Sequence, residues 1–107
     1  LIGNSDMHGG NLSFVSEHGR PYDIAPAYDM TPMAFSPRSG GGLPDALPEA
    51  AIHATVANQT WRHAEALART FLSRITAEIR FSHRFGPCMA ALEHHIETAS
   101  AKIDRLG

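Results

Sequence analysis

Apolar residues recur every three or four positions in two stretches of the C-terminal half, the spacing typical of amphipathic helices. The first helix should begin at Thr60 as N-cap, and Ser82 and Pro87 are suitable near the start of the second. The first apolar stripe is Trp61, Ala64, Leu67, Ala68, Phe71, Leu72 and Ile75, and the second is Met89, Leu92, Ile96, Ala99, Ile103 and Leu106. We expect these two helices to pack antiparallel as a scaffold.

The N-terminal third contains a different pattern. Residues 12–15 alternate between apolar and polar, and a second short run, 20–24, follows a turn that contains Gly19. This arrangement predicts an antiparallel β-hairpin. Pro21 lacks a donor N–H, so the second strand should lie at an edge or begin at Tyr22, and Asp23 should face solvent.

Prolines and glycines separate the hairpin from the helices. They are frequent in residues 34–50, and we expect a mobile or extended segment from Ser36 to Leu47. Residues 50–57 could form a short helix or strand. The chain is therefore expected to be mainly α with a small antiparallel hairpin, divided into residues 1–33, a flexible segment 34–50 and a helical scaffold 51–107.

Composition narrows the class of protein. The 107 residues carry a formal charge of −2 with 19% charged residues, which gives no basic face and does not favour direct nucleic-acid binding. Cys88 is the only cysteine, so no internal disulfide can form and a reducing compartment is expected. No apolar run approaches the ~18 residues of a membrane span. The expected location is the cytoplasm.

The chemistry is concentrated in Asn4-Ser5-Asp6-Met7-His8-Gly9-Gly10-Asn11, followed by Asp29. A carboxylate such as Asp6 can accept a proton from a hydroxyl nucleophile. Asn11 offers a neutral oxygen to a hard cation such as magnesium, and Asp29 offers an anionic one. The interval from Asp6 to Asn11 matches that between the catalytic Asp and the magnesium-binding Asn of protein kinases.

These residues resemble a known family. The stretch LIGNSDMHGGNLSF, followed by IAPAYDM, is similar to the C-terminal lobe of the HipA-like serine/threonine kinases, the toxin halves of HipA/HipB toxin–antitoxin pairs. The family pattern is G-N-x-D-x-H-x-x-N, a hairpin, and then a-P-x-Y-D. The specific motifs cover roughly the first 32 residues, and the remainder fits only as a compatible helical pattern.

The resemblance implies a kinase-like C-terminal lobe that phosphorylates a serine or threonine hydroxyl on a protein. It implies that Asp6 is the catalytic base, that Asn11 and Asp29 bind Mg²⁺ and with it ATP, and that an antitoxin protein is a partner of the full-length chain. The chain departs from ordinary kinases because His8 follows the Asp, and because Met30-Thr31, not Phe-Gly, follows Asp29.

The residues next to Asp6, Asn11 and Asp29 allow more than one interpretation. His8 could be a metal ligand, a base or a structural residue of the catalytic loop, and the structural role is favoured because a kinase needs one proton acceptor. Gly9 and Gly10 should permit a tight turn through angles that a residue with a Cβ resists. Tyr28 should pack beneath the metal loop, and Asp23 is a second candidate for the role of Asp29.

The remaining histidines show no ligand spacing for zinc. His63 and the pair His94-His95 are expected at solvated helical positions, and Trp61 is expected in the core.

Half of a kinase site has no counterpart in this sequence. Kinases hold their nucleotide with a lysine and a glycine-rich loop, yet the only lysine here is Lys102, on the last predicted helix. The chain therefore looks like a fragment that should be inactive by itself. Two alternatives stay open: a small-molecule kinase or metal-dependent phosphohydrolase, and a non-enzymatic helical interaction domain whose loop acids cap turns.

Overall fold

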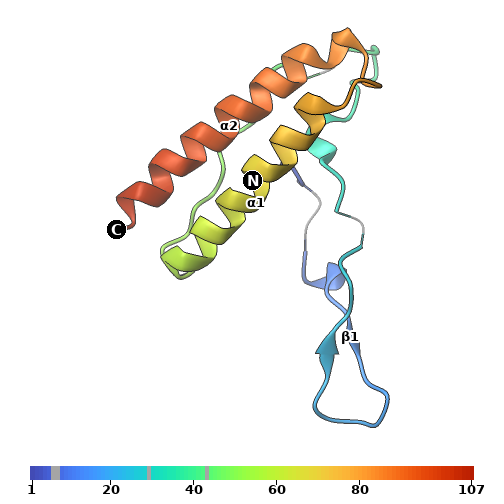
Figure 1. The fold of residues 1–107 in the computed structure, drawn as a ribbon, viewed down its shortest axis with the longest axis vertical. Helices are drawn as coiled ribbons and strands as arrows, with labels where there is room; N and C mark the ends of the chain where they lie inside the picture. Colours follow the sequence, from blue (N-terminus) through green and yellow to red (C-terminus); the bar gives the residue numbers. More distant parts are fainter. Residues whose placement is uncertain (6–7, 29, 43) are drawn as a thin grey trace.

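The structure is a computed structural model that describes residues 1–5, 8–28, 30–42 and 44–107. Over these residues the chain is mainly helical with one two-stranded antiparallel sheet, as the sequence predicts (Figure 1). The elements follow one another as the 3-10 turn η1 (Gly9–Asn11), strands β1 (Phe14–Val15) and β2 (Asp23–Ile24), the 3-10 turn η2 (Met33–Phe35), helix α1 (Asn58–Ala77), the 3-10 turn η3 (His83–Phe85) and helix α2 (Gly86–Arg105).

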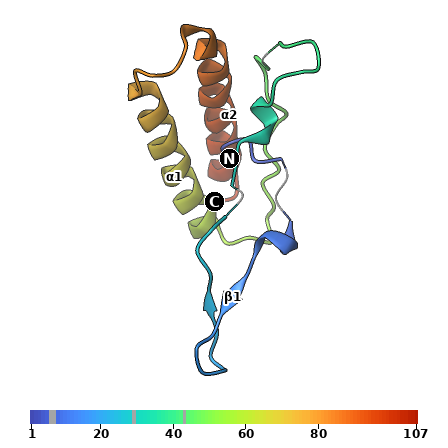
Figure 2. The same ribbon diagram turned by 90° about the vertical axis from the view of Figure 1, so that its right-hand side faces the viewer.

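The two long helices lie side by side and run in opposite directions, which confirms the predicted antiparallel scaffold (Figures 1 and 2). Pro87 occupies the first turn of α2, where its missing N–H costs no hydrogen bond. The predicted N-cap of α1 is wrong by three residues. The helix begins at Asn58, so Thr60 lies inside the first turn, and Ala57 at the N-cap offers no side-chain acceptor. Ser82 caps η3, where its hydroxyl accepts a hydrogen bond from the Arg84 N–H.

The core lies between the helices and the turn η2. Seven of its buried side chains come from α2 and only one, Ala68, comes from α1, because α2 is covered on two sides. Two predictions about these stripes are wrong. Leu67 is 61% exposed, whereas His95 is only 8% exposed. His95 is buried because an irregular segment covers the side of α2 that α1 leaves open.

The hairpin extends away from the helical body (Figure 1). Phe14 pairs with Ile24 and Val15 with Asp23, and all four side chains are exposed. Asp23 faces solvent as predicted, although Tyr22 and Ile24 on either side of it are exposed as well. The alternating pattern thus predicted the strands, while neither face of the two-stranded ribbon is covered by other described residues.

Residues between η2 and α1 follow an irregular path. A turn at residues 38–42 is closed by hydrogen bonds between Arg38 N–H and Gly42 O (2.8 Å) and between Gly41 N–H and Arg38 O (2.7 Å). The described residues from 44 to 57 form no helix or strand, so the short element expected at 50–57 is absent and only a turn occurs there. The segment instead lies against α2 (Figure 2).

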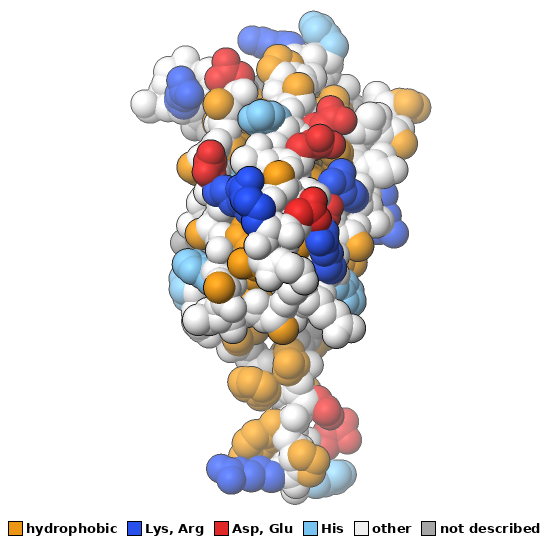
Figure 3. Space-filling view, turned by 90° about the vertical axis from the view of Figure 1, so that its left-hand side faces the viewer, with side chains coloured by type: hydrophobic (Ala, Val, Ile, Leu, Met, Phe, Trp, Pro, Cys, Tyr) orange, Lys and Arg blue, Asp and Glu red, His pale blue; other side chains and the backbone are white. Residues whose placement is uncertain are grey.

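Charged residues of both signs are interspersed over the helical body (Figure 3). Apolar side chains are exposed on the hairpin, next to a few charged ones. Ion pairs join the helices, with Arg62 Nη2 2.6 Å from Asp104 Oδ1 and Arg69 Nη1 3.7 Å from Glu97 Oε1. Among the described residues, no helix has both the length and the apolar character needed to cross a membrane.

Candidate active-site loop

The side chains of His8 and Asn11 both accept hydrogen bonds from the backbone of the turn η1. The Asn11 Oδ1 atom accepts a hydrogen bond from the His8 N–H at 2.9 Å, and His8 Nδ1 accepts one from the Gly10 N–H at 3.0 Å. This reciprocal arrangement is a capping box, which satisfies backbone donors that a short turn would leave open. The His8 imidazole therefore makes a hydrogen bond within the loop, as expected for the structural role that the sequence analysis favours.

Glycine is favoured at position 10 for a reason other than the predicted one. Gly9 and Gly10 do not adopt the left-handed backbone angles that favour glycine. Instead, a Cβ at residue 10 would lie 2.8 Å from His8 Cε1 and 2.9 Å from His8 Nδ1. A side chain here would require the His8 ring to shift, so close approach of the imidazole, not a special φ angle, favours glycine.

Tyr28 fastens the chain that follows the hairpin to this turn. Its hydroxyl donates a hydrogen bond to the Gly10 carbonyl oxygen at 2.9 Å and lies 3.2 Å from Ser13 Oγ. The ring is 45% exposed, so the contact is a hydrogen-bonded bridge at the surface and not burial beneath the loop. The residue before Asp29 and the residue before Asn11 are consequently held together.

Replacing Tyr28 by phenylalanine should lower the free energy of unfolding by about 0.5–1.5 kcal/mol, because one hydrogen bond is lost while the ring remains. Urea denaturation measures the change. Tyr22→Phe is a matched control, since the Tyr22 hydroxyl has no hydrogen-bond partner among the described residues and its ring is similarly exposed. Equal effects of the two substitutions would show that the Tyr28 bridge contributes nothing.

Asn11 and His8 line a hollow of about 460 Å³ between η1 and the base of the hairpin. Its walls are mostly apolar, with Leu12, Ile24 and Met30 among them. An apolar cleft with a few polar groups at one edge is the usual form of a small-molecule site. The hollow therefore places the predicted ligand Asn11 at the border of a space large enough for a small molecule.

Two predicted site residues, Asp6 and Asp29, lie outside the described residues. Of the four residues predicted for the site, His8 and Asn11 lie within the described residues, where both line the same hollow. The donor chemistry suits Mg²⁺, a hard cation that binds oxygen ligands. The Asn11 amide oxygen has two lone pairs and uses one of them for His8 N–H, so a second remains for a cation.

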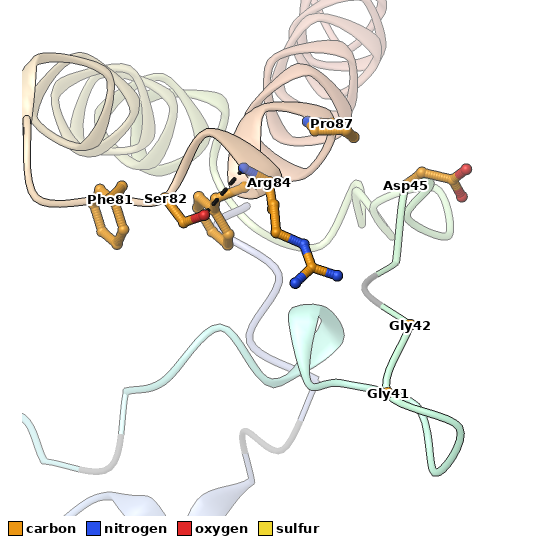
Figure 4. Close-up of a pocket in the computed structure, with 8 residues that line it drawn as sticks. Gly41, Gly42, Asp45, Phe81, Ser82, Arg84 and Pro87 are labelled. Atoms are coloured by element: carbon orange, nitrogen blue, oxygen red, sulfur yellow. Dashed lines mark hydrogen bonds between the residues drawn. The ribbon is translucent and has the colours of Figure 1, made fainter.

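A separate hollow of about 650 Å³ lies at the start of α2, between η3 and the turn at residues 38–42. The Arg84 guanidinium points into it, whereas the Asp45 carboxylate turns outward (Figure 4). Sequence reasoning assigned no role to Arg84, because no motif surrounds it. None of the predicted site residues lines this hollow.

Comparison with known proteins identifies relatives of the whole chain. Residues 1–103 match the family model described as the HipA-like C-terminal domain. The chain is 36% identical over its full 107 residues to the toxin YjjJ of Escherichia coli (strain K12), and it spans 24% of the length of that protein. No solved structure matches.

Proposed function

Because this chain belongs to the family of HipA-like C-terminal domains, we propose that it is the part of a serine/threonine protein kinase that carries the catalytic base and the magnesium ligands. The fold proposed for it is the C-terminal lobe of a kinase-like enzyme, with the loops in residues 1–33 supported by the helices in residues 51–107. The observation that carries the proposal is the bridge from Tyr28 to Gly10, because it joins the segments that precede Asp29 and Asn11.

Each residue has one chemical task in this proposal. Asp6 orients the hydroxyl of the protein substrate and accepts its proton. Asn11 and Asp29 supply oxygen atoms to Mg²⁺, which neutralises charge on the phosphates of ATP when it is bound. His8 holds the loop in shape, since its Nδ1 accepts the Gly10 N–H and its backbone N–H is bound by Asn11.

The nucleotide lysine is proposed to come from another part of the full-length protein. Lys102, the only lysine of this chain, is engaged by Glu49 and the Ala50 carbonyl oxygen on the helical side of the fold. The chain spans about a quarter of its curated relative, which leaves room for a second lobe in that relative. An antitoxin partner and a cytoplasmic location belong to the same proposal.

Incubation of the full-length protein with magnesium and γ-labelled ATP tests the proposed activity. A protein kinase should transfer label to serine or threonine of itself or of an added protein, in a magnesium-dependent manner. A metal-dependent phosphohydrolase would release inorganic phosphate only, and a small-molecule kinase would label neither itself nor protein. Either of these two results would contradict the proposal that the full-length protein is a protein kinase.

The non-enzymatic alternative needs a different measurement. Magnesium added to the full-length protein should shift the amide resonances of Asn11 and Asp29 if these residues bind the cation, and should leave Asp23 unshifted. An interaction domain whose acids merely cap turns should show no selective response at either position.

A further inference from the structure

Three side chains on α2 contact the irregular segment 44–50 at regular intervals. Cys88 Sγ lies 3.2 Å from the Pro44 carbonyl oxygen, His95 and Pro48 line the same cavity, and Lys102 Nζ lies 3.1 Å from the Ala50 carbonyl oxygen. The three side chains are spaced by seven residues, which places them on one face of the helix. The acceptors are main-chain carbonyl groups, which any sequence would offer at these positions.

The segment runs alongside the helix between these contacts and bends at Asp45. From residue 88 to residue 102 an α-helix rises about 21 Å, at ~1.5 Å per residue. Six residues of extended chain, from 44 to 50, span at most about 20–22 Å. Six residues are thus enough to bring the segment from its contact with Cys88 to its contact with Lys102. Prolines at residues 44 and 48 favour such an extended backbone.

The contacts differ in strength and exposure. Cys88 and His95 are buried, and so is Pro44, whereas Lys102 is partly exposed. Lys102 Nζ also lies 2.7 Å from Glu49 Oε2, and this hydrogen bond together with the lysine charge lowers the pKa of the Glu49 carboxyl. Lys102 therefore joins α2 to two consecutive residues of the segment, and it is the outermost contact of the row.

Segment 44–50 borders the residues that precede Asp6. Leu47, Pro48 and Ala50 line one cavity of about 340 Å³ together with Gly3, Asn4, Ser5 and His95. Leu47, Leu1 and Ile2 also pack against the same hydrophobic core. Residues 1–5, which directly precede the proposed catalytic base Asp6, thus lie against the core and the segment.

We propose that Lys102, with His95 and Cys88, is a positioning residue for the catalytic loop: by holding segment 44–50 along α2, it fixes the wall against which residues 3–5 lie. The proposal rests on the proposed function for its effect on turnover, but not for its effect on the loop. A side chain that acts through the backbone of another segment can alter catalysis without touching substrate.

The test is a set of substitutions in the full-length protein. Lys102→Met removes the charge and both hydrogen bonds, Lys102→Arg keeps a cation and its donors, and Glu49→Gln weakens only the ion pair. Arg105→Met is the matched control, because it removes a cation from the same helix end at a residue that acts on Glu49 through its charge alone and, among the described residues, forms no hydrogen bond to the segment.

Two readouts separate the positioning role from the activity. Amide hydrogen exchange should become faster at residues 44–50 and at residues 3–5 in Lys102→Met, less so in Glu49→Gln, and should be restored in Lys102→Arg. Exchange in the middle of α1 should not change. The kcat for phosphoryl transfer should fall roughly 2- to 30-fold in Lys102→Met with KM for ATP unchanged.

The outcomes are distinguishable. Faster exchange at 44–50 with unchanged exchange at 3–5 and unchanged kcat would overturn the positioning role, as would equal effects of Arg105→Met. If the parent protein transfers no phosphoryl group, the proposed function fails, while exchange at residues 3–5 still decides whether Lys102 positions the loop.

Discussion

Substitution of Asp6 by asparagine in the full-length protein should lower phosphoryl transfer by roughly 10²- to 10⁴-fold, the usual contribution of a positioned general base. Asparagine preserves the size of the side chain but cannot accept the proton of the attacking hydroxyl. ATP binding should be largely retained, because Asp6 is not one of the proposed magnesium ligands. Single-turnover transfer of label from ATP measures the rate, and calorimetry measures nucleotide affinity.

Asp23→Asn is the matched control for this substitution. It makes the same chemical change at an exposed strand position near the same loop, and Asp23 pairs across the hairpin with Val15. Its rate should equal that of the parent. Undiminished turnover in Asp6→Asn would show that Asp6 is not the catalytic base. An equal loss of turnover in Asp23→Asn would show that the effect is not specific to Asp6.

Truncation of Ile96 to alanine should destabilise the protein by about 2–5 kcal/mol, since the buried side chain loses its contacts and leaves a cavity. Ile96 is fully buried near the middle of α2, and it belongs to the same core cluster as Phe35 and Ala68. Typical domains are stable by only ~5–15 kcal/mol, so this loss is large. Urea denaturation should show a lower midpoint with an unchanged slope.

Ile79→Ala removes the same atoms from a side chain that is 95% exposed, just beyond the end of α1. Its effect should lie within about 0.5 kcal/mol of zero. If Ile96→Ala costs no more than Ile79→Ala, then the helical pair is not the stable core of this chain. The catalytic loop would then need another source of support.

The two predictions concern parts of the chain that differ in their packing. The loop turn η1 is exposed or half-buried and is held by hydrogen bonds between main chain and side chains. The helices are held by apolar burial. We therefore expect Asp6→Asn to leave stability nearly unchanged, and Ile96→Ala to affect activity only through the fraction of folded protein.

Local sequence patterns predicted the helices and the hairpin, because the spacing of apolar residues and the turn residues that form them lie close together in the chain. Period-two alternation and Gly19 gave the hairpin, and apolar residues spaced by three or four gave both helices. Helix ends were less predictable. Thr60 is a good N-cap by residue type, but the first turn closes from Ala57, where Thr60 N–H and Trp61 N–H bond to its carbonyl oxygen. Residue type alone cannot tell which carbonyl begins the helix.

The amino-acid sequence alone determined the helical scaffold, the hairpin, the family resemblance and the set of candidate residues, because residue order carries spacing and chemical type. Only the tertiary structure showed that His95 is buried, that a Cβ at residue 10 would meet the His8 ring, and that Lys102 bonds to the segment before α1. These properties depend on segments far apart in the chain meeting in space. Helical periodicity could not reveal them, since a histidine facing solvent and one facing a covering segment have the same spacing.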